Sequence, residues 1–348
     1  MIYRTVFYLF LIVIFVYGDA QAVSPSIAGC PTFPANNIWN AAVDKLPVDP
    51  SSAAYIATIG ADTTLHPDFG APYSAGGTLM PIGIPFNIVS SSQTKKAVYF
   101  DYADESDPGP YPIPDNPAIE GVLPGGDQNA GGDRHILIVD KDNCILYEMF
   151  YSWPRADGSW DAGSGAVFDL NSNLLRPDGW TSADAAGLPI LPGLVRYDEV
   201  AAGEITHAIR FTARNSHIRK AYVWPARHQA NTSTSVLLPP MGQRFRLKAG
   251  FNISGFSAHT QVILKAMKKY GLILADNGSD WYITGTANNL WDNDTLVSEF
   301  RLLKGSDFEA VDVSSLMVHP DSGEVKGGNI PPGVSGKSST WNFLLLRD

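Results

Sequence analysis

The sequence predicts a mainly β fold, with a β-sandwich or jelly-roll-like core and one or two C-terminal helices packed on it. Hydrophobic residues make up 45% of the 348 residues and charged residues 17%, which excludes a disordered chain. The 32 Gly and 25 Pro residues follow no repeating period, which excludes collagen and indicates many loops. Between these loops lie short runs rich in β-branched and aromatic residues, which are typical of strands.

Residues 1–22 have the features of a secretory signal peptide. Arg4 supplies a positive charge, residues 7–17 form an unbroken apolar run, and residues 20–22 (Ala-Gln-Ala) give a cleavage pattern. The apolar run is shorter than the roughly 20 residues needed to span a bilayer. A lipoprotein signal ending at Cys30 is the alternative, although Cys30 lies well beyond the run. We therefore expect a secreted, extracellular protein, or a periplasmic one in a Gram-negative source, with no membrane span in the mature chain.

Cys30 and Cys144 are the two cysteines of the chain. In an exported protein, two cysteines most simply form one disulfide, and two buried free thiols are the alternative. The bond would close a long loop and stabilise the fold by roughly 4–5 kcal/mol in the chain-entropy model.

The clearest pair of strands is a hairpin in the middle of the chain. Residues 135–140 and 143–148 are two β-rich runs around Lys141 and Asp142, which predicts a two-residue turn. In that register His135 faces Glu148 across the strands. Further strands are expected at residues 96–101, 166–170, 194–197, 205–212, 220–224, 243–248, 272–275 and 281–284, the last two forming a pair.

Helical periodicity appears late in the sequence. Residues 257–270 have apolar side chains at near-helical spacing, with Ser257 as N-cap and Gly271 as the stop signal. A second helix is expected at residues 295–303, capped by Asp294. Residues 319–348 are rich in Gly, Ser and Pro, which predicts a tail. Residues 23–318 are therefore expected to form a single domain.

Charge is unevenly distributed along the chain. The formal net charge of −10 argues against a nucleic-acid partner, because such proteins concentrate Lys and Arg. Residues 205–275, however, contain 11 Lys and Arg residues and no Asp or Glu. This basic stretch could hold an anionic substrate. Alternatively, its cations attract the acidic remainder of the chain within the fold.

Nucleotide-binding, zinc-protease and serine-hydrolase motifs are absent from the sequence, so the chemistry depends on looser groups of residues. A carboxylate beside an imidazole raises the imidazole pKa and orients the ring, as in acid–base pairs. The catalytic candidates chosen for this reason are Glu148, His135 and Asp133. His207 is a further catalytic candidate, because it shares the apolar, inward face of its expected strand with Ile205 and Ile209. The substrate-binding candidates, at expected strand ends and loops, are Asp101, Arg210, Trp224, Arg227 and His228.

Each of these groups also has a structural interpretation. His135 and Glu148 could form an ion pair, His207 could be a hydrogen-bonded core residue, and the acids around Asp101 could form a solvated turn. We expect no cofactor; the alternatives are Ca²⁺ at the acids around Asp101 and a transition metal held by His135, His207 and His228.

Four stretches resemble a family of uncharacterised secreted microbial proteins: residues 37–40, 101–108, 180–187 and 237–247. The likeness covers most of residues 37–310. It implies secretion and a single domain, and it implies no activity or catalytic residues.

These observations favour a secreted carbohydrate-active enzyme, most simply a polysaccharide hydrolase. Glycoside hydrolysis needs two carboxyl groups about 5–10 Å apart. The candidates are Glu148 with Asp133 or Asp101, and His135 tunes the acid. The eight Trp residues suit stacking on sugar rings, although Trp also serves core packing.

Two alternatives remain open. A polysaccharide lyase would use a His as base and an Arg to neutralise a uronate carboxylate, with His207, Arg210 and His228 as candidates. A non-catalytic glycan-binding protein would need only the aromatic residues.

Overall fold

The computed structural model describes residues 25–123 and 131–327; the expected signal peptide and residues 328–348 of the expected tail lie outside them. Strands predominate over helices in the element order, so the mainly β fold with a few packed helices is confirmed. Within the described ranges, no helix combines the length and the apolarity that crossing a membrane requires.

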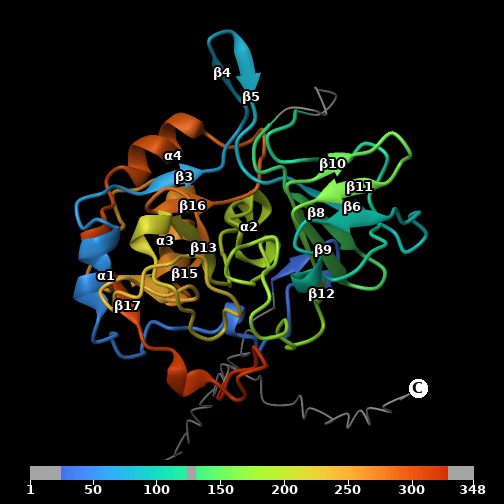
Figure 1. Ribbon diagram of the computed structural model, residues 1–348. Helices are drawn as coiled ribbons and strands as arrows, with labels where there is room; N and C mark the ends of the chain where they lie inside the picture. The colour runs from blue at the N-terminus through green and yellow to red at the C-terminus, as the bar shows by residue number, and fades with distance from the viewer. Residues whose placement is uncertain (1–24, 124–130, 328–348) are drawn as a thin grey trace, which may run out of the picture. The chain divides into compact units, whose positions relative to one another are not determined.

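The largest sheet has six strands and carries three of the helices (Figure 1). Its order is β17 (Phe308–Val311), β14 (Arg244–Leu247), β15 (Leu272–Asn277), β13 (Ile209–Ala213), β16 (Tyr282–Thr284) and β3 (His66–Asp68). β13 runs parallel to β15 and β16 runs parallel to β3, whereas the other three pairs are antiparallel, so the sheet is mixed. The helices α1 (Ser52–Ile59), α3 (Ala258–Lys269) and α4 (Asn293–Phe300) contact β17, β14 and β3, respectively.

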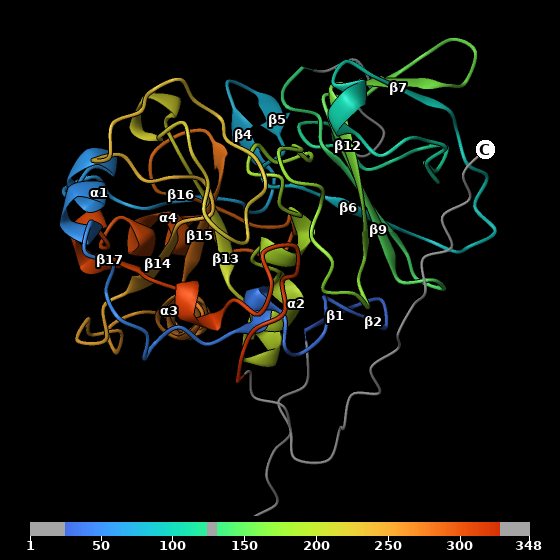
Figure 2. The ribbon, with the colours of Figure 1, turned by 60° about the horizontal axis from the view of Figure 1, so that its bottom comes forward.

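A second sheet has four strands, in the order β12 (Ser164–Asp169), β9 (Ile145–Phe150), β8 (Ile136–Asp140) and β6 (Phe86–Val89). All five residues of β8 are buried, as expected for an interior strand. Figure 2 shows the long strands β9 and β12 side by side. The two large sheets share one hydrophobic core, which also contains residues around the short helix α2 (Tyr197–Ala202).

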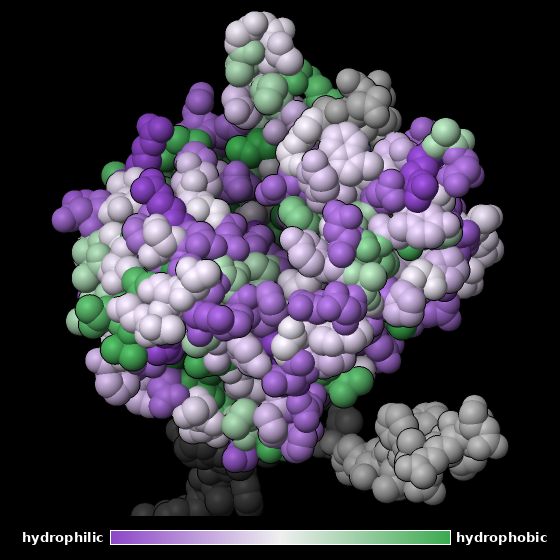
Figure 3. Space-filling view, in the orientation of Figure 1, coloured by the Kyte–Doolittle hydropathy of each residue, from purple (hydrophilic) through white to green (hydrophobic). Residues whose placement is uncertain are grey.

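Three smaller sheets complete the fold. The largest of them is β10 (Trp153–Pro154), β11 (Trp160–Ala162) and β7 (Val98–Phe100). The other two are the pairs β1 (Ser26–Ile27) with β2 (Cys30–Pro31), and β4 (Tyr73–Ala75) with β5 (Thr78–Met80). The β4–β5 hairpin projects from the top of the molecule in Figure 1, and Figure 3 shows pale and green, less hydrophilic residues on it. Its exposed apolar side chains are Tyr73, Leu79 and Met80.

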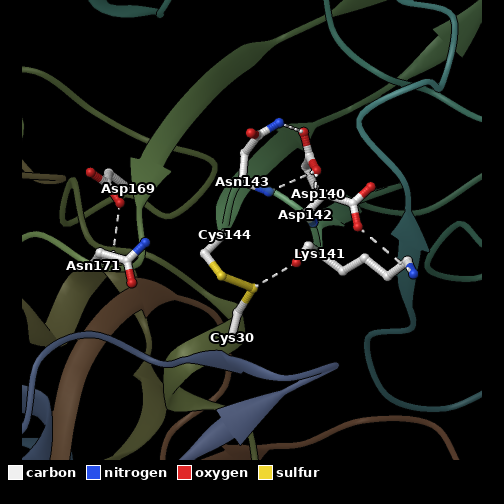
Figure 4. The surroundings of a disulfide bond; sticks show 8 residues. All are labelled: Cys30, Asp140, Lys141, Asp142, Asn143, Cys144, Asp169 and Asn171. Atoms are coloured by element: carbon white, nitrogen blue, oxygen red, sulfur yellow. Dashed lines mark hydrogen bonds and ion pairs between the residues drawn. A yellow bond between two sulfur atoms is a disulfide. The ribbon is translucent and has the colours of Figure 1, made fainter.

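The predicted disulfide is confirmed (Figure 4). Cys30 of β2 is bonded to Cys144, which directly precedes β9, and the two residues are 114 positions apart in sequence. The bond therefore ties the first described strands to the four-stranded sheet.

The register predicted for the central hairpin was wrong by two residues. Asp140 pairs with Ile145, so the loop has four residues rather than two, and Glu148 faces Leu137 rather than His135. The Asp140 carboxylate accepts hydrogen bonds from the backbone N–H groups of Asp142 and Asn143 in this loop (Figure 4). A side chain that caps its own turn stabilises the longer loop.

The helix predicted at residues 257–270 is confirmed as α3, with the Ser257 hydroxyl accepting from the Thr260 N–H. α4 is capped by Asp292, not by Asp294 as predicted, because Asp292 accepts from the Thr295 N–H. The predicted pairing of residues 272–275 with residues 281–284 was wrong. Both segments are strands, but β13 lies between them. α1 and α2 were not predicted; both are short, and only long periodic segments give a clear helical signal.

Candidate functional site

A pocket of about 430 Å³ opens where the two large sheets meet. Its walls come from the segment before β8, the ends of β9 and β15, and the loops at residues 181–185 and 228–230. Four acids and one histidine line it, and no Lys or Arg does among the described residues: Glu105, Asp133, Asp184, His228 and Asp276. We call it the acidic pocket. Its volume falls within the range of ligand-binding sites.

Asp276 is the penultimate residue of β15 and directly follows a bulge in the ladder with β13. Such irregularities commonly redirect side chains near functional sites. Oδ2 of Asp276 lies 2.9 Å from Nη2 of Arg210, and its Oδ1 accepts from the backbone N–H of Ala185 at 3.2 Å. Arg210 is buried and also holds Asp184 through two hydrogen bonds of 2.5 and 2.7 Å. The guanidinium thus lies behind the pocket and fixes two of its carboxylates.

The electrostatic setting of Asp276 favours its protonated form. Burial, followed by repulsion from the Asp184 carboxylate, raises the pKa of Asp276 to about 7, although Arg210 opposes the shift. A carboxyl group with a pKa near 7 can donate a proton at neutral pH.

His228 and Glu105 form a second polar pair in the acidic pocket. Nδ1 of His228 lies 2.8 Å from the carbonyl oxygen of Ala185, so it donates there, and Nε2 lies 3.7 Å from Oε2 of Glu105. Both side chains are partly exposed, at 27% and 32%. The imidazole is therefore oriented by one backbone group and presents its other nitrogen toward a carboxylate in the pocket.

Asp133 stands at the mouth of the acidic pocket on an unusual stretch of backbone. The residue is exposed, but partial desolvation of its carboxyl group raises its pKa. The nearby carboxylates of Glu120 and Asp276 raise the pKa further, against the attraction of His135. The next residue, Arg134, has a φ of +52°, a conformation that non-glycine residues rarely adopt. Strained backbone of this kind tends to cluster at functional sites.

His135 lies behind Asp133 rather than in the pocket. Its Nδ1 is 2.5 Å from Oε2 of Glu120, and its Nε2 is 3.1 Å from the carbonyl oxygen of Ala183. Burial alone would lower the pKa of His135, but the Glu120 carboxylate outweighs it and raises the pKa to about 9. The same contact lowers the pKa of Glu120 in spite of its burial. The protonated His135 therefore contributes a positive charge behind the pocket, which acts on the carboxylates of Asp133 and Asp276.

Glu148 does not line the acidic pocket. It is completely buried, and its carboxylate accepts hydrogen bonds of 2.8–3.0 Å from the backbone N–H groups of Ile190 and Leu191. Burial raises its pKa to about 7, although these two donors oppose the shift. Glu148 joins β9 to the turn that precedes α2.

The other residues predicted for the site lie apart from it. His207 is fully buried and bonds Glu199 at 3.1 Å, while Arg227 pairs with Asp321 at 2.7 Å. Trp224 donates from Nε1 to the carbonyl oxygen of Ser322. Asp101 is exposed and is not among the residues that line the acidic pocket. Arg227 and Trp224 therefore form their polar contacts with residues 320–322, near the start of the expected tail.

Of the predicted site residues, the structure brings Asp133 and His228 into the acidic pocket and places Arg210 directly behind it. Sequence reasoning did not select Glu105, Asp184 or Asp276. Glu105 and Asp184 fall in two of the stretches that carry the family resemblance, residues 101–108 and 180–187. That coincidence was one signal for them, and Glu105 also belongs to the group of acids around Asp101 that the sequence offered as a functional site or a solvated turn.

Aromatic side chains surround the mouth of the acidic pocket. Tyr102 and Phe150 line it, and Tyr102 is 56% exposed. The ring of Phe150 lies 6.0 Å from that of Tyr151, which lies 5.5 Å from that of Trp153. Tyr102 and Phe150 thus place aromatic rings next to the acids, whereas the Trp153 ring is covered by the Arg134 guanidinium at 3.9 Å.

No group of three or more His, Cys, Asp or Glu residues suited to holding a metal ion occurs in the part of the chain that the structure describes. The chain matches no protein-family model, no curated protein and no solved structure. The resemblance based on four stretches therefore stays a prediction.

Proposed function

We propose that the chain is a secreted polysaccharide hydrolase whose active site is the acidic pocket. The observation that carries the proposal is the convergence of Asp133, Asp276 and Glu105 in one pocket rimmed by aromatic rings. Two carboxyl groups with different environments are what glycoside hydrolysis requires. Secretion is supported by the signal-like segment at residues 1–22 and by the disulfide.

In this proposal Asp276 is the general acid. Its pKa near 7 keeps a large fraction protonated at neutral pH, so it can protonate the leaving glycosidic oxygen. Asp133, exposed at the mouth, supplies the second carboxylate. Arg210 acts as a positioning residue, because it holds Asp276 from behind and does not face the pocket.

His228 and Glu105 are assigned to substrate binding. An imidazole nitrogen and a carboxylate side by side form hydrogen bonds with sugar hydroxyls, and Tyr102 and Phe150 offer their rings to the apolar face of a sugar.

The composition of the acidic pocket favours hydrolysis over elimination. A lyase needs a cation to neutralise the uronate carboxylate, whereas no Lys or Arg lines the pocket among the described residues. Of the lyase candidates, His228 lines the pocket, but His207 is enclosed with Glu199 away from it, and Arg210 is occupied by Asp184 and Asp276. We therefore propose a neutral rather than an anionic glycan as the substrate.

The test is a panel of neutral and uronate-containing polysaccharides, scored for new reducing ends and for ultraviolet-absorbing unsaturated products. We expect reducing ends from a neutral polysaccharide, and a loss of about 100-fold or more in Asp276→Asn. Asp294→Asn, an exposed acid in the first turn of α4, is the matched control and keeps full activity. Unsaturated products, or binding without cleavage of any member of the panel, would overturn the proposal.

A further inference from the structure

A second polar pocket, of about 450 Å³, lies at the β3 edge of the six-stranded sheet. It is bounded by the end of α1, the strands β3 and β16, the turn after β13, and the residue that follows α4. Its charged and titratable side chains are His66, Arg214, His217, Asp280, Tyr282 and Arg301. We call it the cationic pocket, because four of these groups are basic and one is a carboxylate.

The single carboxylate of the cationic pocket is already engaged. Asp280 is 7% exposed, and its Oδ1 lies 2.9 Å from Nδ1 of His217 while its Oδ2 lies 3.2 Å from Nε of Arg214. It also accepts a hydrogen bond from the backbone N–H of Arg214. Asp280 therefore holds both basic side chains in place, and Nε2 of His217 and the terminal amino groups of Arg214 remain for a ligand.

Arg301 adds a further positive charge to the cationic pocket. Within the described ranges, no carboxylate pairs with its side chain, which is exposed directly after α4. Its charge also acts on His66: burial, and then repulsion from Arg301, lower the pKa of that imidazole. The ring of His66 packs against Tyr282 at 4.3 Å. Two guanidinium groups and two imidazoles thus share one concave surface with one buried counter-charge.

We propose that the cationic pocket binds a compact oxyanion: a phosphate, or the carboxylate of an acidic sugar. Guanidinium groups form charge-assisted hydrogen bonds with such groups, and a bound anion would offset the repulsion among the cations. Thr63, Thr64 and Ser279 also line the pocket, and their side chains carry hydroxyl groups, which are neutral donors. This site is separate from the acidic pocket, with which it shares no lining residue, and it does not depend on the hydrolase proposal.

The test is calorimetric titration of the purified chain with inorganic phosphate, with glucuronate and with glucose, at low ionic strength because salt screens exposed charges. We expect saturable binding of an anion and none of glucose in this pocket. Binding of phosphate alone identifies a phosphate ligand, and binding of glucuronate identifies an acidic sugar. The absence of binding by both anions would overturn the proposal.

Variants locate the binding. Arg301→Gln and Arg214→Gln are each expected to weaken anion affinity about tenfold or more, since each removes a charge-assisted hydrogen bond. Arg301→Gln is the cleaner variant, because its side chain has no ion pair among the described residues and its loss leaves Asp280 paired. The matched control is Lys265→Gln, which removes an equal charge from the exposed face of α3. Equal affinities in all three variants would place the anion elsewhere and overturn the proposal.

Discussion

Nη2 of Arg210 lies 2.5 Å from Oδ1 of Asp184 and 2.9 Å from Oδ2 of Asp276, so one guanidinium holds two carboxylates of the acidic pocket. Arg210 comes from the stretch of residues 205–275 that contains no acid of its own. This arginine of the basic stretch is thus neutralised inside the fold by acids from other parts of the chain. It supports the acids rather than presenting a cation to an anionic substrate in this pocket.

Two other arginines of the same stretch also pair with acids from outside it. Arg246 pairs with Glu309 at 2.8 Å, and Arg227 pairs with Asp321 at 2.7 Å. Arg244 is buried without a carboxylate partner among the described residues, and it donates to the carbonyl oxygens of Tyr270 and Ile38. Burial lowers its pKa to about 9. Of the two interpretations of the basic stretch, attraction within the fold is the one that these contacts favour.

The first prediction concerns the stability of this arrangement. Arg210→Met leaves Asp184 and Asp276 facing each other without a counter-charge in a buried setting, so we expect unfolding to become easier by about 3–5 kcal/mol. Denaturant unfolding of both proteins measures the difference. Arg155→Met, which breaks the exposed pair with Asp161, is the control and should change stability by less than about 1 kcal/mol. Equal losses in the two variants would contradict the prediction.

The second prediction concerns the pH dependence of hydrolysis. If Asp276 is the proton donor, the rate falls as the pH rises through about 7, because the deprotonated form has no proton to donate. Measuring kcat from about pH 5 to about pH 9 tests whether the rate falls in this way. Glu105→Gln should lower the rate but keep this limb of the profile, and Asp276→Asn should lose it. A limb that survives in Asp276→Asn would show that another group donates the proton.

Local features of the sequence predicted much of the fold. The Ser257 cap and the apolar periodicity before Gly271 act within one helix. The sequence has two cysteines, so each had a single possible partner. The pairing of strands depends on distant segments. β13 therefore inserts between β15 and β16, although the turn at residues 276–279 alone favours a hairpin.

The candidate site was harder to predict for the same reason. Asp133, Asp184 and Asp276 come from three segments separated by more than 40 residues, and no local spacing links them. The adjacency of His135 and Glu148 was inferred from a two-residue turn, and the capping of the loop by Asp140 changed it. His135 instead pairs with Glu120, which lies outside the hairpin.

The third prediction uses that pair. The pKa of His135 is raised to about 9 from an ordinary value of 6.5, so the protonated ring stabilises the fold below pH 6.5, and this stabilisation is lost as the pH rises to 9. The loss should be on the order of 3 kcal/mol, at 1.36 kcal/mol for each unit of the shift. We expect the free energy of unfolding of the wild type to fall over this range more steeply than that of Glu120→Gln.

Measurement of unfolding at several pH values in both proteins gives the difference directly. His319→Gln, which changes an exposed histidine, should follow the wild type and serves as the control. Parallel curves for the wild type and Glu120→Gln would show that His135 gains no stabilising charge from its partner.

The fourth prediction concerns the disulfide between Cys30 and Cys144. The double variant Cys30→Ser with Cys144→Ser frees a loop of 114 residues in the unfolded chain. We therefore expect a loss of roughly 4–5 kcal/mol, because the unfolded state regains the entropy that the bond removes. Denaturant unfolding with and without a reducing agent provides the measurement. The reducing agent should lower the midpoint of the wild type toward that of the double variant and leave the double variant unchanged, whereas equal midpoints without it would refute a stabilising role for the bond.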